Sequence, residues 1–471
     1  MHKKYLQKFS NFIWFFFSIL LLVFIAFSII GYYLLLAERA FLNPKIGFIL
    51  VVIGSFIFFM VIYNSIRFYR EKKQKFYISS RFLSKSLMIF AFIVLSIQIP
   101  LAFNIYEKFN FFEKQPSPYD SFLGTPFQLN ASGVIYDSIP GVPSAHCSSL
   151  IYLKNGDLLC AWYAGSYEKA SDVAIWMSRC HPNLIGNGSL ELNWSTPIIV
   201  ADTVNHSEGQ PVWYQTPKGR LFLFYQTLRP TAPLFGDWGP IIETGWSVAK
   251  IKFIYSDDFG YTWVEPQYLC NFYFWTLRNP PLLTSKENVI LPIEFLGSSF
   301  FLINNDPDLE SKWIPHCRLY SPQSLTQPSL VELNSGDLMA VFRTGNGRIY
   351  KSYSPDGGFS WYKPKPMRFP NPDSCVALLH LKDGRNLILC NPKTSSRETL
   401  SFILGDETGH YWSEPSYVKN QSGKEFSYPN MVQLPDQSIV FTYTNQRINI
   451  GYGRFTLEAL NHMEINYEIY E

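Results

Sequence analysis

The sequence has little charge and no bias toward either sign. Only 16% of its 471 residues are Asp, Glu, Lys or Arg, compared with roughly 25% in ordinary soluble proteins. The 40 basic and 37 acidic residues leave a net charge of +3, which is too balanced for a protein that neutralises many phosphates of a nucleic acid. Glycine and proline are near average, which excludes collagen-like and low-complexity chains. We therefore expect a folded chain without a nucleic-acid partner.

The sequence also lacks the motifs of common cofactor sites. It contains no glycine-rich phosphate loop, no dinucleotide fingerprint and no cysteine–histidine spacing typical of zinc. We expect no cofactor and no metal. The seven cysteines are an odd number, so at least one is unpaired. Most lie in apolar strands, which favours buried thiols, with one disulfide as the alternative.

Long apolar runs are abundant near the N-terminus. Residues 11–36, 47–66 and 87–105 carry no charge, and each is close to the ~20 residues that cross a bilayer as a helix. They predict three transmembrane helices in contact with lipid. A cleaved signal peptide is the alternative for the first run. That run is longer than the roughly 7–15 apolar residues of a signal, and two further runs follow it.

Basic residues beside these runs predict their orientation. The first loop has only Arg39 and Lys45, whereas the N-terminal tail and the second loop are rich in lysine and arginine. Because basic loops stay in the cytoplasm, everything after residue 105 is predicted to be extracytoplasmic, in the periplasm or outside the cell. The predicted organisation is a membrane anchor over 1–110, a linker over 111–125 and an outer domain over 126–471.

The outer domain repeats one unit, in which an apolar strand, a turn and a second apolar strand follow one another. The turns of the six copies lie at Gly156, Gly219, Asn288, Gly336, Gly384 and Gln437. A spacing of about 50–70 residues fits one four-stranded sheet per repeat. The predicted fold class is an all-β six-bladed β-propeller preceded by three transmembrane α-helices. An array of β-sandwiches is the alternative.

A second element recurs within these repeats. Residues 256–263 read SDDFGYTW, residues 354–361 read SPDGGFSW, and a worn copy, GDETGHYW, occupies 405–412. The element resembles the Asp-box, or BNR repeat, of the sialidase (neuraminidase) superfamily, whose fold is a six-bladed propeller. The resemblance covers nearly all of 120–471. We expect the Ser and Asp of each box to hold a hairpin turn and its Trp to pack between strands, away from any active site.

A propeller brings the starts of its innermost strands, and the ends of the strands that follow them, to one mouth of the central channel. Aligning the copies on their turns places at the strand starts His146, Gln210, Arg278, Gln327, Asp373 and Tyr428. The strand ends place there Tyr163, Gln226, Glu294, Arg343, Asn391 and Thr444. A merely solvated rim would contain Lys, Ser and Gly, so this polar and aromatic ring predicts a ligand site.

The resemblance implies roles for part of this ring. Sialidases hold the carboxylate of an acidic sugar with three arginines and use a tyrosine, paired with a glutamate, as nucleophile. Tyr428 matches the nucleophile, and Arg343 and Arg397 resemble the second and third arginines. This sequence departs from the pattern at His146, where the first arginine is expected, and at Gln327, where the glutamate is expected.

Further candidates complete the predicted site. Glu168 and Asp172 lie in the loop where the general acid and base is expected, and Glu168 has the better spacing. His146 or Arg278 would compensate for the missing arginine, and Asn391 is assigned to substrate binding. Arg343 or a carboxylate such as Glu294 would assist Tyr428.

Other interpretations of these residues stay open. Tyr428 could be a packed strand aromatic, the arginines could be ion-pair partners, and Glu168 and Asp172 could be solvated loop charges. His146 could be a structural histidine, and Arg278 could only brace its blade. Arg447, just past the last hairpin, is a weaker candidate for the rim.

These patterns predict a membrane-anchored, extracytoplasmic, sialidase-like exo-glycosidase that acts on a terminal acidic sugar of a glycan. The alternative is a catalytically inactive protein of the same fold that binds glycans as a lectin or serves in envelope assembly. A transporter or channel is a third interpretation. It is disfavoured because the apolar runs contain no ionisable group along which an ion could pass.

Overall fold

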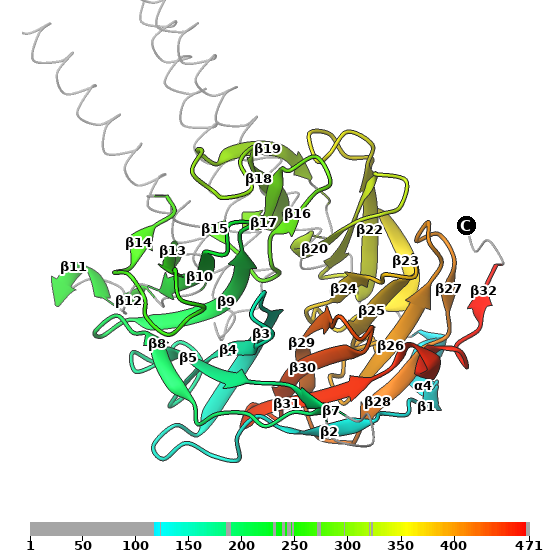
Figure 1. The fold of residues 1–471 in the computed structure, drawn as a ribbon, viewed down its shortest axis with the longest axis horizontal. Coiled ribbons are helices and arrows are strands. Elements are labelled where there is room, and N and C mark those ends of the chain that lie inside the picture. The colour runs from blue at the N-terminus through cyan, green and yellow to red at the C-terminus, as the bar shows by residue number, and fades with distance from the viewer. Residues whose placement is uncertain are drawn as a thin grey trace, which may run out of the picture. The chain divides into compact units, whose positions relative to one another are not determined.

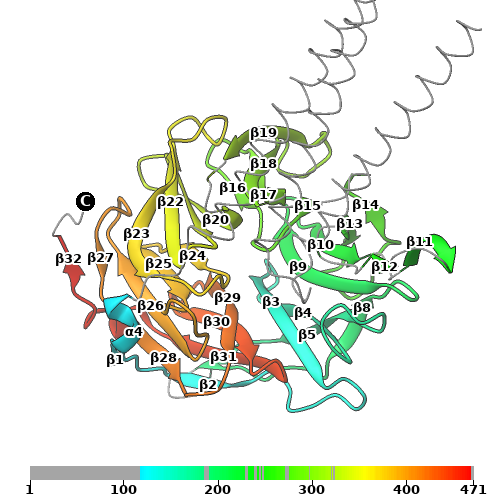
Figure 2. The same cartoon turned by 180° about the vertical axis from the view of Figure 1, so that it is seen from behind.

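The computed structural model describes residues 117–467, apart from 123, 185–189, 229–231, 238–240, 243–245, 247–248, 271–274, 296, 320 and 322–323. These residues belong to one compact unit, Lys114–Glu471. Their β-sheets are arranged around a common centre (Figure 1), and the view from behind shows the same arrangement (Figure 2).

Four of the described sheets have four strands each. The first two contain β3 (Ser144–Tyr152), β4 (Leu158–Gly165), β5 (Ala174–Cys180) and β8 (Ile198–Ala201), and β9 (Ser207–Gln215), β10 (Leu221–Leu228), β13 (Ala249–Ser256) and β14 (Gln267–Tyr268). The other two contain β20 (Thr326–Glu332), β21 (Leu338–Arg343), β22 (Arg348–Ser354) and β23 (Lys365–Pro370), and β29 (Phe426–Gln433), β30 (Ile439–Asn445), β31 (Asn449–Phe455) and β2 (Ala131–Val134).

Two described sheets are larger. One has five strands, β15 (Trp275–Thr276), β16 (Leu282–Leu283), β17 (Val289–Phe295), β18 (Ser298–Asn304) and β19 (Ile314–Leu319). The other has seven, β24 (Ala377–His380), β25 (Asn386–Cys390), β26 (Thr399–Gly405), β28 (Ser416–Asn420), β1 (Thr125–Pro126), β27 (Trp412–Ser413) and β32 (Ile465–Asn466).

Small elements lie beside these sheets. Two-stranded pairs are formed by β6 (Asn183–Leu184) with β7 (Leu190–Glu191), and by β11 (Ala232–Asp237) with β12 (Ile241–Ile242). The described helices are α4 (Pro118–Ser121) and the 3₁₀ helix η2 (Leu457–Leu460).

The all-β propeller is confirmed, but the predicted fold class is wrong in the form stated. The expectation of six four-stranded blades is wrong, because one described sheet has five strands and another has seven. The predicted transmembrane helices at 11–36, 47–66 and 87–105 lie outside the described residues. Within the described ranges, no helix has both the length and the apolar character needed to cross a membrane. The fold is therefore corrected to an all-β propeller with unequal sheets.

The ring of sheets is closed by contacts between inner strands. Strand β3 contacts β9 on one side and β29 on the other, and β24 contacts β20 and β29. Strand β2, which precedes β3 in the chain, completes the last sheet by pairing antiparallel with β31. The two ends of the domain are therefore joined in one sheet, which holds the ring closed.

The innermost strands share a local distortion near the centre. Cys147, Gln210, Gln327, Asp373 and Tyr428 all have positive φ, between 48° and 66°. The pairing register shifts around four of these residues, in β3, β9, β20 and β29. A left-handed conformation costs a non-glycine residue roughly 1–2 kcal/mol, and a β-bulge redirects the side chains next to it.

Proline marks three of these bulges. Gln210, Gln327 and Tyr428 are each followed directly by a proline. Proline donates no hydrogen bond to a sheet and is tolerated at bulges. The dipeptides Gln-Pro and Tyr-Pro are thus the local sequence feature of the bulges from which central side chains are presented.

The Asp-boxes have the structural role expected of them. In the second box Ser354 Oγ accepts a hydrogen bond from the Gly358 amide at 2.8 Å and donates to Asp356 Oδ1 at 2.9 Å. Asp356 Oδ1 also accepts from the Ser360 amide at 2.8 Å. The ring of Trp361 stacks on Phe301 with centroids 4.5 Å apart. Each contact stabilises the β22–β23 turn rather than a ligand.

Replacing Ser354 by alanine should destabilise the domain by about 1–3 kcal/mol, because the buried Gly358 amide loses its acceptor. Chemical denaturation of the purified protein measures this change. Ser335→Ala, in an exposed turn, is the matched control and should change stability by less than about 0.5 kcal/mol. Equal effects of the two substitutions would contradict the role of the box.

Candidate functional site

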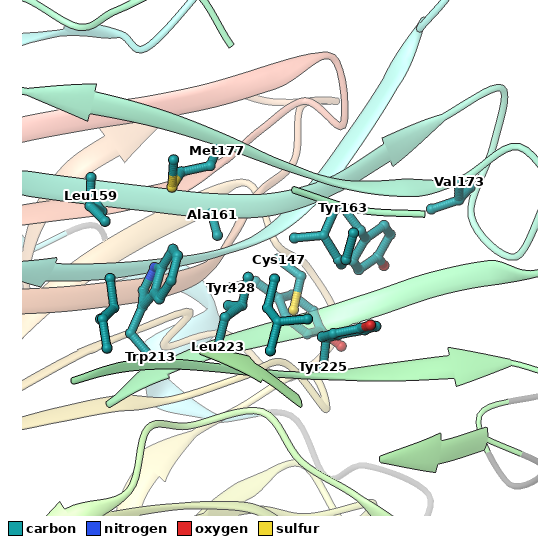
Figure 3. Close-up of a cluster of buried hydrophobic side chains, with 14 of the residues drawn as sticks. Cys147, Leu159, Ala161, Tyr163, Val173, Met177, Trp213, Leu223, Tyr225 and Tyr428 are labelled. Carbon is teal, nitrogen blue, oxygen red and sulfur yellow. The ribbon is translucent and has the colours of Figure 1, made fainter. Parts of the chain in front are cut away.

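Tyr428 lies at the bulge of β29, near the centre of the ring. Its side chain is 8% exposed and belongs to the buried cluster that contains Cys147 and Tyr163. Figure 3 shows these three residues within the cluster. The phenolic oxygen accepts a hydrogen bond from Arg343 Nη1 at 2.7 Å. Tyr428 is therefore more than a packed strand aromatic, because its hydroxyl is hydrogen-bonded to a cation.

Three guanidinium groups surround the Tyr428 ring. The Cζ atoms of Arg278, Arg397 and Arg343 lie 5.4, 5.5 and 6.0 Å from the ring centroid. Cations within about 6 Å of an aromatic face are attracted by its quadrupole. These arginines come from three different sheets or their connections, so only the closed ring brings them together.

Arg343 ends β21 and connects Tyr428 with the neighbouring sheet. Its Nε donates to Thr326 Oγ1 at 3.1 Å and forms an ion pair with Asp373 Oδ1 at 3.1 Å. Because Thr326 lies on β20 and Asp373 lies before β24 with a positive φ, the orientation of Arg343 depends on both of these segments. An arginine held in this way can present its remaining N–H groups without a large loss of rotamer freedom.

Glu425 bridges two further arginines. Its Oε1 accepts from Arg397 Nη1 at 3.2 Å and its Oε2 from Arg447 Nε at 2.8 Å. Burial opposes ionisation of Glu425, but hydrogen bonds from Arg447 and Ser427 and the charges of Arg447 and Arg397 lower its pKa. The carboxylate therefore stays charged and holds both guanidinium groups in place.

The two acidic candidates of the first loop are placed differently. Glu168 Oε2 accepts from Arg447 Nη1 at 2.6 Å, and its Oε1 accepts from Trp246 Nε1 at 3.0 Å. Asp172 instead accepts hydrogen bonds from the amide and hydroxyl of Ser166 in its own loop. Glu168 thus contacts the group formed by Arg343, Arg397, Arg447 and Glu425, the arginine cluster. Asp172 has the contacts of a turn-forming residue.

His146 is a buried neighbour of the phenol. Its ring lies 4.2 Å from that of Tyr428 and 5.6 Å from that of Tyr163, centroid to centroid. Burial, and then the charges of Arg447, Arg397, Arg278 and Arg343, lower the pKa of His146. The imidazole is consequently neutral, so it does not replace the charge of the arginine expected at this position.

Four further predicted site residues differ in their burial and contacts. Gln327 has positive φ and a buried Oε1 without a hydrogen-bond partner. Glu294, half-buried on β17, is close enough that its charge raises the pKa of Arg343 against the opposing effect of burial. Asn391 is fully buried, and its Nδ2 donates to the carbonyls of Thr399 and Phe426, each at 2.7 Å. Arg278 is 1% exposed and donates to main-chain carbonyls.

The cluster keeps donors for an anion. The side chains of Arg343, Arg397 and Arg447 are 17%, 25% and 34% exposed. No hydrogen bond within the described part of the chain uses Arg343 Nη2, Arg397 Nε or Arg447 Nη2. Guanidinium groups match the geometry of a carboxylate, so the arrangement can bind one beside the phenol.

Sequence reasoning missed two members of this cluster. Glu425 was not predicted at all, and Trp246 lies in a segment that the repeats did not align. Arg447 was only a weak candidate, although it contacts both Glu168 and Glu425. Glu425 lies three residues before Tyr428 in KEFSYP, and this spacing was the available signal. In a regular strand it would indicate which face each side chain occupies, but the bulge after Ser427 interrupts the alternation.

Replacing Glu425 by glutamine should destabilise the domain by about 1–3 kcal/mol at neutral pH, because two charge-assisted hydrogen bonds weaken. Since the folded-state pKa of Glu425 is lowered, its contribution is complete above the unfolded pKa of roughly 4.3 and is lost as the pH falls through the folded value. Denaturation at several pH values should show the gap between wild type and variant closing in acid. A gap independent of pH would contradict the ion pairs.

The described sheets form a closed ring, a β-propeller, whose centre holds a tyrosine surrounded by arginines. Residues 156–441 match the model of the BNR repeat-like domain family. Since the match covers more than half of the chain, the protein belongs to this family. No curated protein sequence matches the chain.

Solved structures support the same fold. A protein of unknown function from Dyadobacter fermentans is 16% identical, with a TM-score of 0.59 over 69% of this chain and 98% of that one. A leech intramolecular trans-sialidase is 14% identical, with a TM-score of 0.56 over 71% of each chain. The NanB sialidase of Streptococcus pneumoniae is 14% identical, with a TM-score of 0.54 over 71% of each chain. At these identities the likeness establishes the fold alone.

Proposed function

We propose that this protein binds a terminal acidic sugar of a glycan at the arginine cluster and hydrolyses its glycosidic bond as an exo-acting, sialidase-like glycosidase. One observation carries the proposal: Arg343 and Arg397 lie beside Tyr428, Glu425 joins Arg397 to Arg447, and each of these arginines keeps an N–H group that no described residue uses. A carboxylate on the sugar ring would be held by these groups.

The residues around this carboxylate support roles in hydrolysis. Tyr428 would lose its phenolic proton to water and attack the anomeric carbon as the phenolate, and Arg343, which donates to its oxygen, would stabilise the negative charge there. The bond to the leaving oxygen would break as the bond to Tyr428 forms, and water would later release the sugar from Tyr428. Glu168 would donate a proton to the leaving oxygen and later accept one from water, as general acid and base. Its hydrogen bonds to Arg447 and Trp246 fix its orientation.

A specific observation favours a second function, glycan binding without hydrolysis. Gln327 stands where the resemblance calls for a glutamate, and an amide cannot accept the phenolic proton. Within the described ranges no carboxylate is hydrogen-bonded to the Tyr428 oxygen; its hydrogen-bond partner there is Arg343. The arginine cluster would then serve recognition alone.

The extracytoplasmic location stays a prediction, because it rests on residues outside those described.

The deciding experiment combines binding and turnover on the purified full-length protein. Fluorogenic sialosides and glycosides of related nonulosonic acids test hydrolysis, and calorimetry with the free acidic sugars tests binding. Turnover supports the glycosidase, and binding without turnover supports the second function. If neither is observed with any acidic sugar, whereas a neutral glycan binds, the proposed carboxylate recognition is wrong.

A further inference from the structure

Arg278 differs from the other arginines of the centre in its burial. It follows β15 and is 1% exposed, one of the largest fully buried side chains of the described residues. Arg343, Arg397 and Arg447 are 17% to 34% exposed. A ligand held at the exposed arginines would therefore not reach Arg278.

The hydrogen bonds of Arg278 use only one of its three nitrogen atoms. Nη2 donates to the carbonyl oxygens of Tyr428 at 2.9 Å and of Ser148 and Pro429 at 3.2 Å. Nε and Nη1 are buried and have no hydrogen-bond partner. The three acceptors are neutral, so they orient the guanidinium without matching its charge.

Two carboxylates of the centre are already paired with other arginines. Asp373 pairs with Arg343, and Glu425 pairs with Arg397 and Arg447. The acidic groups whose charges act on Arg278 are two thiols and two phenols, Cys147, Cys375, Tyr428 and Tyr163. Burial raises the pKa of Cys147 to about 12 and also raises the pKa of Tyr163, so neither supplies a negative charge at neutral pH.

Further buried donors lie on a neighbouring segment. Asn371 Nδ2 and Ser374 Oγ are fully buried and have no hydrogen-bond partner. Ser374 precedes Cys375, whose Sγ lies 3.8 Å from Oδ1 of Asn279, the residue after Arg278. A buried cation without a matching charge is the feature that an anion satisfies, because an unpaired buried charge is strongly unfavourable. Asn371 and Ser374 are two further buried donors on a segment that contacts the residue after Arg278.

We propose that Arg278 binds a small monovalent inorganic anion, such as chloride, in the interior of the propeller behind Tyr428. The anion would neutralise the guanidinium through Nε and Nη1, while Nη2 keeps the main chain of Tyr428 and Ser148 in place. The bulges at Cys147 and Tyr428 carry positive φ, so a charge-matched Arg278 would stabilise the strained part of two inner strands. This site is independent of the carboxylate site and of the proposed function.

The linewidth of the chloride NMR signal tests the proposal on the purified full-length protein in a gluconate buffer. Wild type should broaden the signal in a saturable way, and bromide should reverse the broadening. Arg278→Met should lose it. Arg454→Met is the matched control, because Arg454 is also buried but pairs with Asp436 at 2.9 Å; it should retain the broadening.

Two further results keep the proposal falsifiable. If Arg278→Met does not fold, wild-type crystals grown in bromide should show anomalous density within hydrogen-bonding distance of Arg278, and density only at the exposed arginines would overturn the proposal. Broadening that an acidic sugar abolishes would also overturn it, because the chloride would then occupy the carboxylate site. If no acidic sugar binds but Arg278→Met still loses the broadening, the proposed function fails and the anion site stands.

Discussion

Replacing Tyr428 by phenylalanine should abolish hydrolysis of an acidic glycoside while leaving its binding nearly unchanged. The ring of the variant would keep its contact with His146 and the three surrounding guanidinium groups. The oxygen that accepts from Arg343 and would attack the sugar is removed. Loss of a nucleophile lowers kcat by on the order of 10³-fold or more, and steady-state kinetics with a fluorogenic sialoside measures this change.

Tyr443→Phe is the matched control for this prediction. Tyr443 is 2% exposed on β30 and packs in a different apolar cluster, so its hydroxyl should not affect turnover. If Tyr428→Phe turns over substrate as fast as wild type, Tyr428 is not the nucleophile, although another residue could still support hydrolysis. If wild type only binds, the variant should change affinity by no more than a few-fold.

Replacing Arg343 by methionine should weaken binding of an acidic sugar by roughly 10²–10³-fold. Truncating one partner of a buried, hydrogen-bonded charge pair costs about 2–5 kcal/mol, and about 1.4 kcal/mol is tenfold in affinity. The substitution removes the donor to Tyr428 and leaves Asp373 without its cation. Calorimetric titration with the free sugar measures the loss, and turnover should fall with it if the protein is a glycosidase.

Arg385 provides a control, because it forms an ion pair away from the arginine cluster. Arg385 pairs with Asp383 at 2.6 Å beside the β24–β25 hairpin, so Arg385→Met removes a comparable ion pair without affecting the ligand. Arg343→Lys should recover only part of the affinity, because an ammonium group cannot form a bidentate contact with a carboxylate. Unchanged affinity in Arg343→Met would exclude the carboxylate from this position.

Alignment on the hairpin turns predicted which residues approach the centre. Tyr428 was selected from the sixth copy of the repeat and Arg343 from the fourth, and a hydrogen bond joins them in the folded chain. The Asp-boxes were also interpreted correctly, because their Ser, Asp and Gly lie within a few residues of one another. Such contacts are local, so spacing along the chain is enough to predict them.

Alignment did not predict which way each side chain points. Arg278 is engaged with main-chain carbonyls and Asn391 with the carbonyls of Thr399 and Phe426, so neither has the contacts of a group that faces a ligand. Asp172 and Glu168 were ranked by spacing, but only their hydrogen bonds separated them. The reason is their position: all four lie in loops or just past the end of a strand, where no alternation along a strand fixes the direction of a side chain.

The amino-acid sequence by itself determined that this chain contains a β-rich repeat domain, where its hairpins and Asp-boxes lie, and which copies contribute polar residues to the centre. These features follow from short-range apolar alternation and turn chemistry. Only the tertiary structure decided that the sheets are unequal, that Glu425 joins Arg397 to Arg447, and that Arg278 is buried without a carboxylate. Those facts depend on which segments meet when the ring closes, because the residues that contact one another lie 22 to 150 positions apart in the chain.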